Sequence, residues 1–486
     1  MKLGSDARSG VRFLLILAVA LLGWRLWAVS HADITLYVDE AQYWTWAQHM
    51  DWGFFSKPPG IAALIWLSTA LFGDGILGVK ALAMLCYPLA AAAGWAVARR
   101  LYDARTAFWS ALAILTLPMF SWLGLFVSTD ALLTLFWMLG LWAWLRARDS
   151  DAWGDWLLLG VVCGLGLLSK YTMAAFLGAA FLYLLAFERH RLASTKPWAA
   201  ALLALLILSP NIAWNIAHDF PTLKHTADIT LNRDTGGGLK PLGEFWVAQW
   251  AAFGPILGSV FLLILLNAVD SWRDERRRLL LWFALPLWLV VSAQAFKSSA
   301  NANWAAPAFA PAAIAAIAWL LAGKRQKLVA WAIGLNVLLV SLLYHWPTVL
   351  AVAQVSQPAK KSPYSRARGW DELGRQLSPI LSAHPDAVLI ADNRTLLAHM
   401  LYETRAQHPL AASWNPSGQA ADHYKLTTSL LPHVGRDMLL ITDTAPGDDF
   451  ASRFAGIEKL ARLEAPLDER TSRTMAVYLL HGFKGY

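Results

Sequence analysis

Charged residues are scarce in this chain of 486 residues. Only 15% of them are Asp, Glu, Lys or Arg, whereas soluble domains carry roughly 25%, and 57% of the chain is hydrophobic. A composition this poor in charge excludes an ordinary soluble protein. We therefore expect a mainly α polytopic membrane helix bundle.

Cysteine is also nearly absent. The two cysteines, Cys86 and Cys163, both lie inside apolar runs, which excludes a disulfide framework and a thiolate metal site. The C-terminal part of the chain has no glycine-rich phosphate-binding motif. No small-residue cleavage site follows the first apolar run at 13–29, so we expect this run to be a retained helix rather than a signal peptide.

The apolar runs predict about eleven membrane spans. A further run at 61–72 is interfacial, re-entrant or an additional span, and several boundaries are loose, so the expected number is about 11 to 13. The other runs are 13–29, 81–98, 106–127, 131–145, 153–168, 171–187, 197–212, 246–269, 279–296, 304–322 and 328–344.

Every second connection between these runs is strongly basic, for example Arg99, Arg100 and Arg105, or Arg273, Arg276, Arg277 and Arg278. By the positive-inside rule these connections and the N-terminus face the cytoplasm. The acidic loop at 37–44, the connection 211–245 and everything after 344 then lie outside. Because most of the net charge of +8 follows this topology, it does not indicate a nucleic-acid partner.

Two adjacent acids, Asp39 and Glu40, follow the first apolar run directly. Carboxylates beside lipid lose hydration, so they usually have a cation, a proton to accept or a water-filled cavity nearby. Aromatic residues around them, including Tyr43, suit a half-wet interface. The competing interpretation is a solvated acidic helix start.

Several basic residues break the topological rule because they lie on the outer side, where an ammonium group can bind a lipid phosphate. Individually, each of them could be a snorkelling anchor. They are Lys57, Lys170, Lys224, Arg233, Lys240 and Lys297. Asp130 begins a helix on the same side, where it either caps that helix or belongs to the site.

Two further outer segments are polar. The first, with His218, Lys224 and His225, could close over a bound lipid, whereas a metal site there would need a third fixed ligand. The second ends in Asn303 and Trp304, whose amide and indole could bind a sugar.

The chain after 344 has ordinary polarity. Helices at 370–381 and 395–404 alternate with strands at 387–391, 438–442 and 475–480, which predicts a small α/β domain. We therefore divide the chain into a transmembrane catalytic domain, 1–350, and a periplasmic α/β domain, 351–486. Turns at 392–394 and 443–444 lie at strand ends, where sheets often bind ligands, but a cap or scaffold is favoured.

The first outer loop, Tyr37-Val38-Asp39-Glu40-Ala41-Gln42-Tyr43-Trp44 through Phe54-Phe55-Ser56-Lys57-Pro58-Pro59, resembles that of bacterial lipid-linked-sugar glycosyltransferases. These enzymes are relatives of protein O-mannosyltransferases and of the lipid A aminoarabinose transferase. Ser128-Thr129-Asp130-Ala131 and Ser169-Lys170-Tyr171 are similar too. The resemblance covers roughly residues 10 to 345.

This resemblance implies the GT-C fold and a polyprenyl-phosphate sugar donor used on the periplasmic side of the bacterial inner membrane. It places Asp39 at the catalytic centre and Lys57 and Lys170 near the donor phosphate. Ser56 and Trp304 depart from the aminoarabinose transferases, where an acid and a tyrosine are common, which weakens both a bound metal and aminoarabinose as the sugar. A neutral hexose, a pentose or an acidic sugar stays open.

The mechanism that this resemblance implies is a single displacement with inversion. Asp39 is the candidate base, and Glu40 orients its surroundings or, with Asp39, ligates a divalent metal ion; no cofactor is required. The acceptor is a cell-envelope glycolipid of the lipid A or lipopolysaccharide type, a polysaccharide or a protein. The predicted donor and substrate set is Lys57, Tyr43, Asp130, Lys170, Tyr171, His218, Lys224, Lys297, Asn303 and Trp304.

Three alternatives stay open. A secondary transporter or lipid flippase would also place ionisable residues among many spans, but it tends to have internal repeats and charges near the midplane, which this chain does not show. A protein O-mannosyltransferase would differ in its acceptor alone. A purely structural subunit would leave the outward lysines unexplained.

Overall fold

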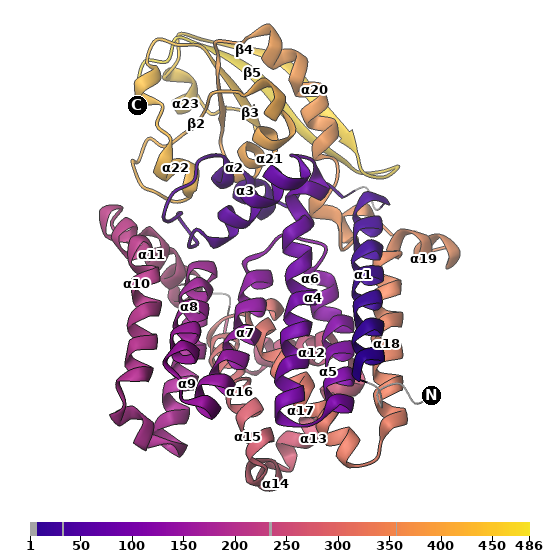
Figure 1. The fold of residues 1–486 in the computed structure, drawn as a ribbon. Coiled ribbons are helices and arrows are strands. Elements are labelled where there is room, and N and C mark those ends of the chain that lie inside the picture. The colour runs from indigo at the N-terminus through magenta and orange to yellow at the C-terminus, as the bar shows by residue number, and fades with distance from the viewer. Residues whose placement is uncertain (1–6, 32–33, 233–235, 356) are drawn as a thin grey trace.

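The computed structural model describes residues 7–31, 34–232, 236–355 and 357–486, so Arg233 lies outside the described residues. Helices form a bundle, and a small α/β domain sits at one end of it, above α2 and α3 (Figure 1). The mainly helical fold with a C-terminal α/β part was predicted from the sequence.

Six helical stretches in the described chain are long and apolar enough to cross a membrane. Polar backbone groups in lipid must be satisfied within the segment, which favours continuous helices. The six lie in α1 (Ala7–His31), α4 (Ile76–Leu101), α10 (Thr195–Ala217), α15 and α16 (Glu275–Trp282, Leu285–Lys297), η3 and α17 (Ala302–Ala308, Phe309–Ala322), and α18 (Gln326–Tyr344).

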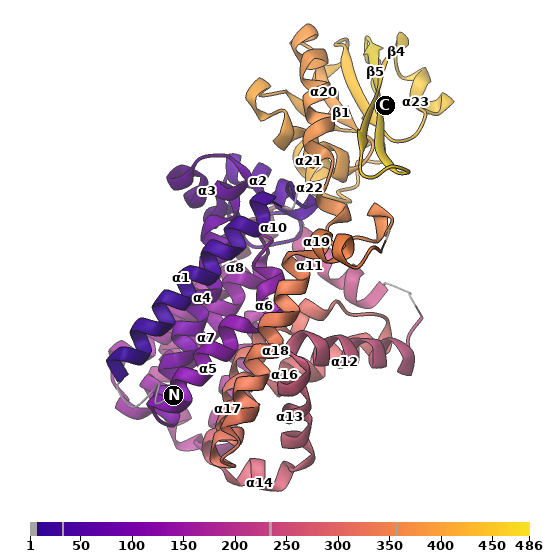
Figure 2. The same cartoon turned by 90° about the vertical axis from the view of Figure 1, so that its right-hand side faces the viewer.

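A seventh span arises if α12 (Leu239–Phe253) and α13 (Pro255–Leu266) are counted together, although they are bent by 118° at Gly254. Figure 2 shows α12 lying across the bundle and α13 running along it. Gly254 has φ +88, and a Cβ there would lie 2.0 Å from Asn336 Oδ1, so the bend requires glycine.

The predicted number of 11 to 13 spans depends on how the remaining apolar helices cross the membrane. Most of them have 6 to 17 residues, whereas α7 (Thr129–Ser150) has 22. Pro118 separates α5 from α6, because a residue before proline avoids the helical region, and Leu117 has ψ 129. These helices are α3 (Gly60–Phe72), α5 (Ala104–Thr116), α6 (Pro118–Leu123), α7 (Thr129–Ser150), α8 (Trp153–Ser169) and α9 (Met173–Phe187).

Short helices complete the bundle. They are η1 (Arg189–Ala193), α11 (Pro221–Ala227), η2 (Asp228–Asn232), α14 (Ala268–Arg273) and α19 (Trp346–Val352). The boundary between 350 and 351 that we drew from the sequence falls inside α19.

The C-terminal domain contains a five-stranded sheet in the order β2-β1-β3-β5-β4. β1 pairs in parallel with β2 and β3, whereas β5 is antiparallel to β3 and β4. The strands are β1 (Val388–Ala391), β2 (Ala411–Ser413), β3 (Met438–Thr442), β4 (Gly456–Pro466) and β5 (Ser472–His481). The helices are η4 (Ala359–Lys361), η5 (Ser365–Ala367), α20 (Trp370–Ala383), α21 (Arg394–Glu403), η6 (Arg405–Gln407), α22 (His423–Thr427), η7 (Leu431–His433) and α23 (Asp448–Ser452).

The short helix α2 (Val38–Gln48) lies between the bundle and this domain (Figures 1 and 2). Thr45 contacts the Tyr424 hydroxyl of the domain at 3.1 Å. Trp44 Nε1 donates to Asp74 Oδ1 at 2.5 Å, and Tyr402 donates to the Asp74 carbonyl at 3.3 Å. Eight residues of α2 are buried, because the helix is covered on both sides.

Candidate active site

Asp39 lies in the first turn of α2, on the side that faces the C-terminal domain. Its side chain is 48% exposed, and its Oδ1 accepts a hydrogen bond at 2.9 Å from Nη2 of Arg394. Nη1 of the same guanidinium donates to Gln42 Oε1. Because residues three apart share a helix face, one arginine holds both side chains.

Glu40 faces the other way, into the bundle, and its side chain is only 1% exposed. Lys80 Nζ donates to Oε1 at 2.5 Å and the Val127 N–H donates to the same oxygen at 2.6 Å, while the Tyr37 N–H donates to Oε2 at 2.7 Å. Lys80 is fully buried, so the two charges form an enclosed ion pair. Glu40 therefore anchors α2 to the bundle, and its side chain and that of Asp39 have different partners.

Asp130 and Lys170 form a second ion pair. Lys170 Nζ donates to Oδ1 of Asp130 at 2.7 Å, and Asn303 Nδ2 donates to Oδ2 at 2.7 Å. Asp130 is buried, whereas Lys170 is 17% exposed at the end of α8. Three of the predicted site residues therefore meet in one contact, and Trp304 follows Asn303 in η3, half-buried against the core.

Lys57 is half-buried in the loop between α2 and α3. Burial, with the charge of Lys170 next, lowers its pKa to about 8, and Asp39 and Asp130 act in the opposite direction. Both acids and both lysines therefore lie within electrostatic reach of one another. Part of the Lys57 population is neutral slightly above physiological pH, and a bound anion would restore its charge.

Two further groups surround this cluster. Burial, and then the charge of Asp39, raises the pKa of Tyr43 far above its usual value, so its hydroxyl stays protonated. Burial and the charge of Lys57 lower the pKa of His225, whose ring contacts Phe55 with centroids 5.1 Å apart. His225, predicted to lie in a segment that closes over a lipid or contributes to a metal site, therefore lies within electrostatic reach of Lys57.

Other predicted residues have different contacts within the described part of the chain. His218 stacks on Trp214 and contacts its carbonyl at 2.9 Å, and Lys224 pairs with Asp219 at the surface. Lys297 is exposed at the end of α16. None of these contacts, within the described residues, joins His218, Lys224 or Lys297 to Asp39.

Tyr171, next to Lys170, donates its hydroxyl to Asn211 Oδ1 at 2.5 Å. Asn215 Nδ2 donates to the Tyr171 oxygen at 3.1 Å. Tyr171 therefore ties Lys170 to α10 and supports the wall of the site.

The geometry does not support a metal ion bound by both Asp39 and Glu40, because Asp39 contacts Arg394 of the C-terminal domain whereas Glu40 contacts Lys80 of the bundle. Among the described residues, no three His, Cys, Asp or Glu side chains come close enough together to hold a metal ion. Glu40 already uses both oxygens in hydrogen bonds.

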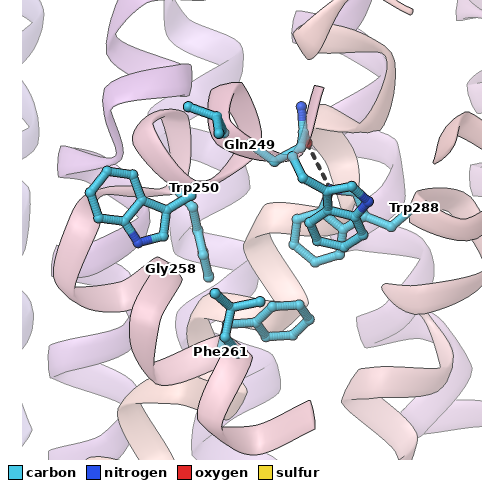
Figure 3. Close-up of a pocket in the computed structure, with 9 residues that line it drawn as sticks. Gln249, Trp250, Gly258, Phe261 and Trp288 are labelled. Atoms are coloured by element: carbon cyan, nitrogen blue, oxygen red, sulfur yellow. Dashed lines mark hydrogen bonds between the residues drawn. The ribbon is translucent and has the colours of Figure 1, made fainter. Parts of the chain in front are cut away.

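An apolar cavity of about 320 Å³ lies in the bend between α12 and α13 (Figure 3). Gly258 forms part of its wall and packs closely on α12, because a Cβ there would lie 2.8 Å from Trp250. Gln249 connects this cavity to the ionic site: it accepts from Trp288 Nε1 at 2.7 Å and donates to the Ala302 carbonyl at 2.9 Å, next to Asn303. The lining is Trp246, Val247, Gln249, Trp250, Phe253, Gly258, Phe261, Leu262 and Trp288.

Comparison with known proteins supports a glycosyltransferase. Residues 56–214 match the family model described as dolichyl-phosphate-mannose-protein mannosyltransferase. The chain is 30% identical to the lipid A galacturonosyltransferase RgtD of Rhizobium johnstonii over 428 residues, which are 87% of this chain and 90% of that relative. It is 27% identical over 265 residues to an undecaprenyl phosphate-alpha-4-amino-4-deoxy-L-arabinose arabinosyl transferase of Pseudomonas fluorescens, covering 50% of this chain and 44% of the relative.

The fold is similar to the crystal structure of ArnT from Cupriavidus metallidurans bound to undecaprenyl phosphate. The TM-score is 0.65 at 17% identity, and the match covers 96% of this chain and 97% of that one. Fold and site together define a membrane glycosyltransferase of the GT-C class. The chain belongs to the family of glycosyltransferases that use polyprenyl-phosphate-linked sugars, together with the galacturonosyltransferase that it matches over most of its length.

Proposed function

We propose that this enzyme transfers a sugar from a polyprenyl-phosphate donor to a hydroxyl group of a lipid A-type glycolipid at the periplasmic face of a bacterial inner membrane. The observation that carries this proposal is the electrostatic coupling of half-buried Lys57 to Lys170, Asp39 and Asp130, in a helix bundle that also holds an apolar cavity. A carboxylate, a half-buried ammonium group and an apolar chamber suit a substrate that is a lipid at one end and a sugar phosphate at the other.

Asp39 is the proposed base. Its Oδ1 is held by Arg394, and within the described residues Oδ2 accepts no hydrogen bond, which leaves that oxygen for the acceptor hydroxyl. As the acceptor oxygen forms its bond to the anomeric carbon, its proton moves to Asp39, and the bond from the anomeric carbon to the phosphate oxygen breaks. One such displacement inverts the anomeric centre.

Lys57 is the proposed partner of the departing phosphate. The leaving group gains negative charge as the bond breaks, and a cation in a poorly hydrated site stabilises that charge more strongly than water does. Lys170 is already paired with Asp130, so its role is to add positive potential and to fix that wall of the site.

The proposed sugar is galacturonic acid. Support comes from the extent of the match to lipid A galacturonosyltransferase, since the arabinosyl transferase is matched over half of the chain. Presenting purified enzyme with polyprenyl-phosphate galacturonate and with the aminoarabinose donor tests this choice. Transfer of aminoarabinose alone would contradict it.

The apolar cavity is the proposed holder of the first isoprene units of the donor. Its wall is almost entirely aromatic and aliphatic, and its volume of about 320 Å³ falls within the range of ligand pockets. Gln249 joins this wall to η3 through the Ala302 carbonyl, and Asn303 of η3 joins Asp130, so two hydrogen bonds connect the cavity wall with the ion pair of Asp130 and Lys170.

The proposed topology has the 11 to 13 spans predicted from the sequence. In it, the shorter apolar helices also cross the membrane, either tilted or with two consecutive helices forming one span. The basic residues of α14 and α15, Arg273 and Arg276 to Arg278, lie at the end of the bundle opposite α2 (Figure 1). By the positive-inside rule, α2 and the 351–486 domain then face the periplasm.

Asp39→Asn tests the reaction directly. The amide keeps the size of the side chain but loses basicity, so turnover should fall by roughly 10²-fold or more while donor binding persists. Asp51→Asn is the matched control, because Asp51 is an exposed acid that follows α2 and accepts from Trp214 Nε1 at 2.6 Å. Near-wild-type turnover by Asp39→Asn would contradict the proposed base.

The acceptor is tested by mass spectrometry of envelope glycolipids, polysaccharides and proteins from cells with and without the gene. Loss of a hexuronic acid from lipid A is the expected result. Loss from a polysaccharide or a protein, with lipid A unchanged, would contradict the proposed acceptor.

A further inference from the structure

Arg394 comes from the C-terminal domain, 355 positions along the chain from the carboxylate that it contacts. Its guanidinium reaches across the domain boundary with one nitrogen on Asp39 and another on Gln42. Arginine is suited to such a contact because its planar group presents several donors in a fixed geometry.

The backbone that carries Arg394 is held firmly. β1 ends at Ala391, and the next turn is capped by Asn393, whose Oδ1 accepts from the Thr395 and Leu396 N–H groups at 3.0 Å each. Asp392 Oδ2 accepts from the Thr442 hydroxyl at 2.8 Å. A side chain at the start of such a capped helix is positioned by the sheet rather than by a loose loop.

We infer that Arg394 is a positioning residue for Asp39, supplied by the C-terminal domain, so that this domain completes the active site. The inference rests on the proposed role of Asp39 as the base. Arg394 occupies Oδ1, and Oδ2 accepts no hydrogen bond from the described residues, in the same way that a third group orients a catalytic base in other enzymes. The pair is 39% and 48% exposed, so it is open to substrate rather than sealed as a structural ion pair.

Another assignment for Arg394 is direct binding of the donor phosphate, because its charge is among those that act on Lys57. The two roles differ in the kinetic parameter that they affect. A phosphate ligand mainly changes donor affinity, whereas a group that aligns the base mainly changes turnover at saturating donor.

The experiment compares purified full-length Arg394→Gln, Arg394→Ala and Arg394→Lys with Arg405→Ala. Arg405 is the matched control because it also joins the domain to the membrane part, through Asp74 at 3.4 Å, and contacts no residue of the site. Melting temperature is measured for each, so that kinetic values are compared among folded proteins.

The expected result is a fall in kcat of about 10- to 100-fold for Arg394→Gln, with the donor KM within a few-fold of wild type, since misalignment by about 1 Å can have that effect. Arg394→Lys should retain more activity than Arg394→Gln. Millimolar guanidinium ion should restore part of the turnover of Arg394→Ala and should not affect Arg405→Ala.

Equal kcat values for Arg394→Gln and Arg405→Ala would overturn the inference, as would a rise in donor KM with kcat unchanged. If Asp39→Asn is inactive while Arg394→Gln behaves like the control, the proposed role of Asp39 stands and this inference alone fails. If Asp39→Asn turns over normally, both fail.

Discussion

Replacing Glu40 with glutamine should damage the fold far more than the chemistry. Glu40 and Lys80 are 1% and 0% exposed, and the carboxylate accepts three hydrogen bonds, from one ammonium and two backbone N–H groups. Glu40→Gln keeps the shape of the side chain but leaves Lys80 as a buried charge without its counterion. Breaking a buried pair in this way costs about 3–5 kcal/mol of stability.

The assay is thermal unfolding in detergent, followed by intrinsic tryptophan fluorescence. The control is Arg375→Ala, which removes an exposed ion pair with Glu372 and should change stability by about 0–1 kcal/mol. The double variant Glu40→Gln with Lys80→Met should regain much of the loss, because it removes the uncompensated charge. Turnover per folded Glu40→Gln molecule should fall much less than in Asp39→Asn.

The reasoning would be refuted by a Glu40→Gln protein that melts like the wild type and yet has lost turnover as completely as Asp39→Asn. That outcome would place Glu40 in the reaction itself. Recovery of that turnover by added divalent ion would restore the metal-binding role considered from the sequence.

Three further predictions follow from the site and the fold. The kcat/KM for donor should fall as pH rises through about 8, because Lys57 then loses the positive charge that attracts the phosphate. Lys57→Arg should remove this decrease at high pH while weakening donor use overall, and a decrease that persists unchanged in Lys57→Arg would contradict the assignment. Leu262 lies at the partly exposed rim of the apolar cavity, and Leu262→Trp should narrow it. The ratio of kcat/KM for a long-chain donor to kcat/KM for a short prenyl analogue should then fall by about tenfold, and an unchanged ratio would place the prenyl chain elsewhere. A cysteine at Gly447, on the C-terminal domain, should react with a membrane-impermeant thiol reagent from the periplasm, whereas a cysteine at Arg273, on α14, should not. The reverse labelling pattern would invert the topology.

The C-terminal domain shows which elements a sequence can predict. β3 was predicted at its observed bounds because four apolar residues precede Thr442 in a segment flanked by polar residues, and α20, α21, β1 and β5 were predicted within a few positions. β4 was missed because it is an edge strand with charged residues such as Glu458, Lys459 and Arg462 along it. β2 has three residues, too few to show a period.

The first outer loop was recognisable because charges beside apolar runs require partners. The sequence did not reveal which partners they have. Glu40 and Lys80 are 40 positions apart, and Lys80 precedes an apolar run in which nothing marks it as a buried counterion. Asp130, Lys170 and Asn303 were each selected separately, and their meeting depends on how α7, α8 and η3 pack.

Arg394 was the residue hardest to identify in advance. The turn at 392–394 was noted as a strand end that could bind ligands, but a scaffold was favoured, because the sequence does not show which face of the domain meets the membrane part. That information lies in contacts between the two parts, such as Thr45 with Tyr424 and Asp74 with Tyr402, which join residues more than 300 positions apart.

The position of α2 has a practical consequence for engineering relatives of this protein. Because α2 is covered by the bundle on one side and by the C-terminal domain on the other, its surface is complementary to both. A chimaera that takes its C-terminal domain from a relative would place foreign residues against the resident Asp39 and Gln42, where Arg394 lies in this protein. Such exchanges should therefore include residues 34–59 with the domain, so that the acid, its neighbour and the arginine that holds them are inherited together.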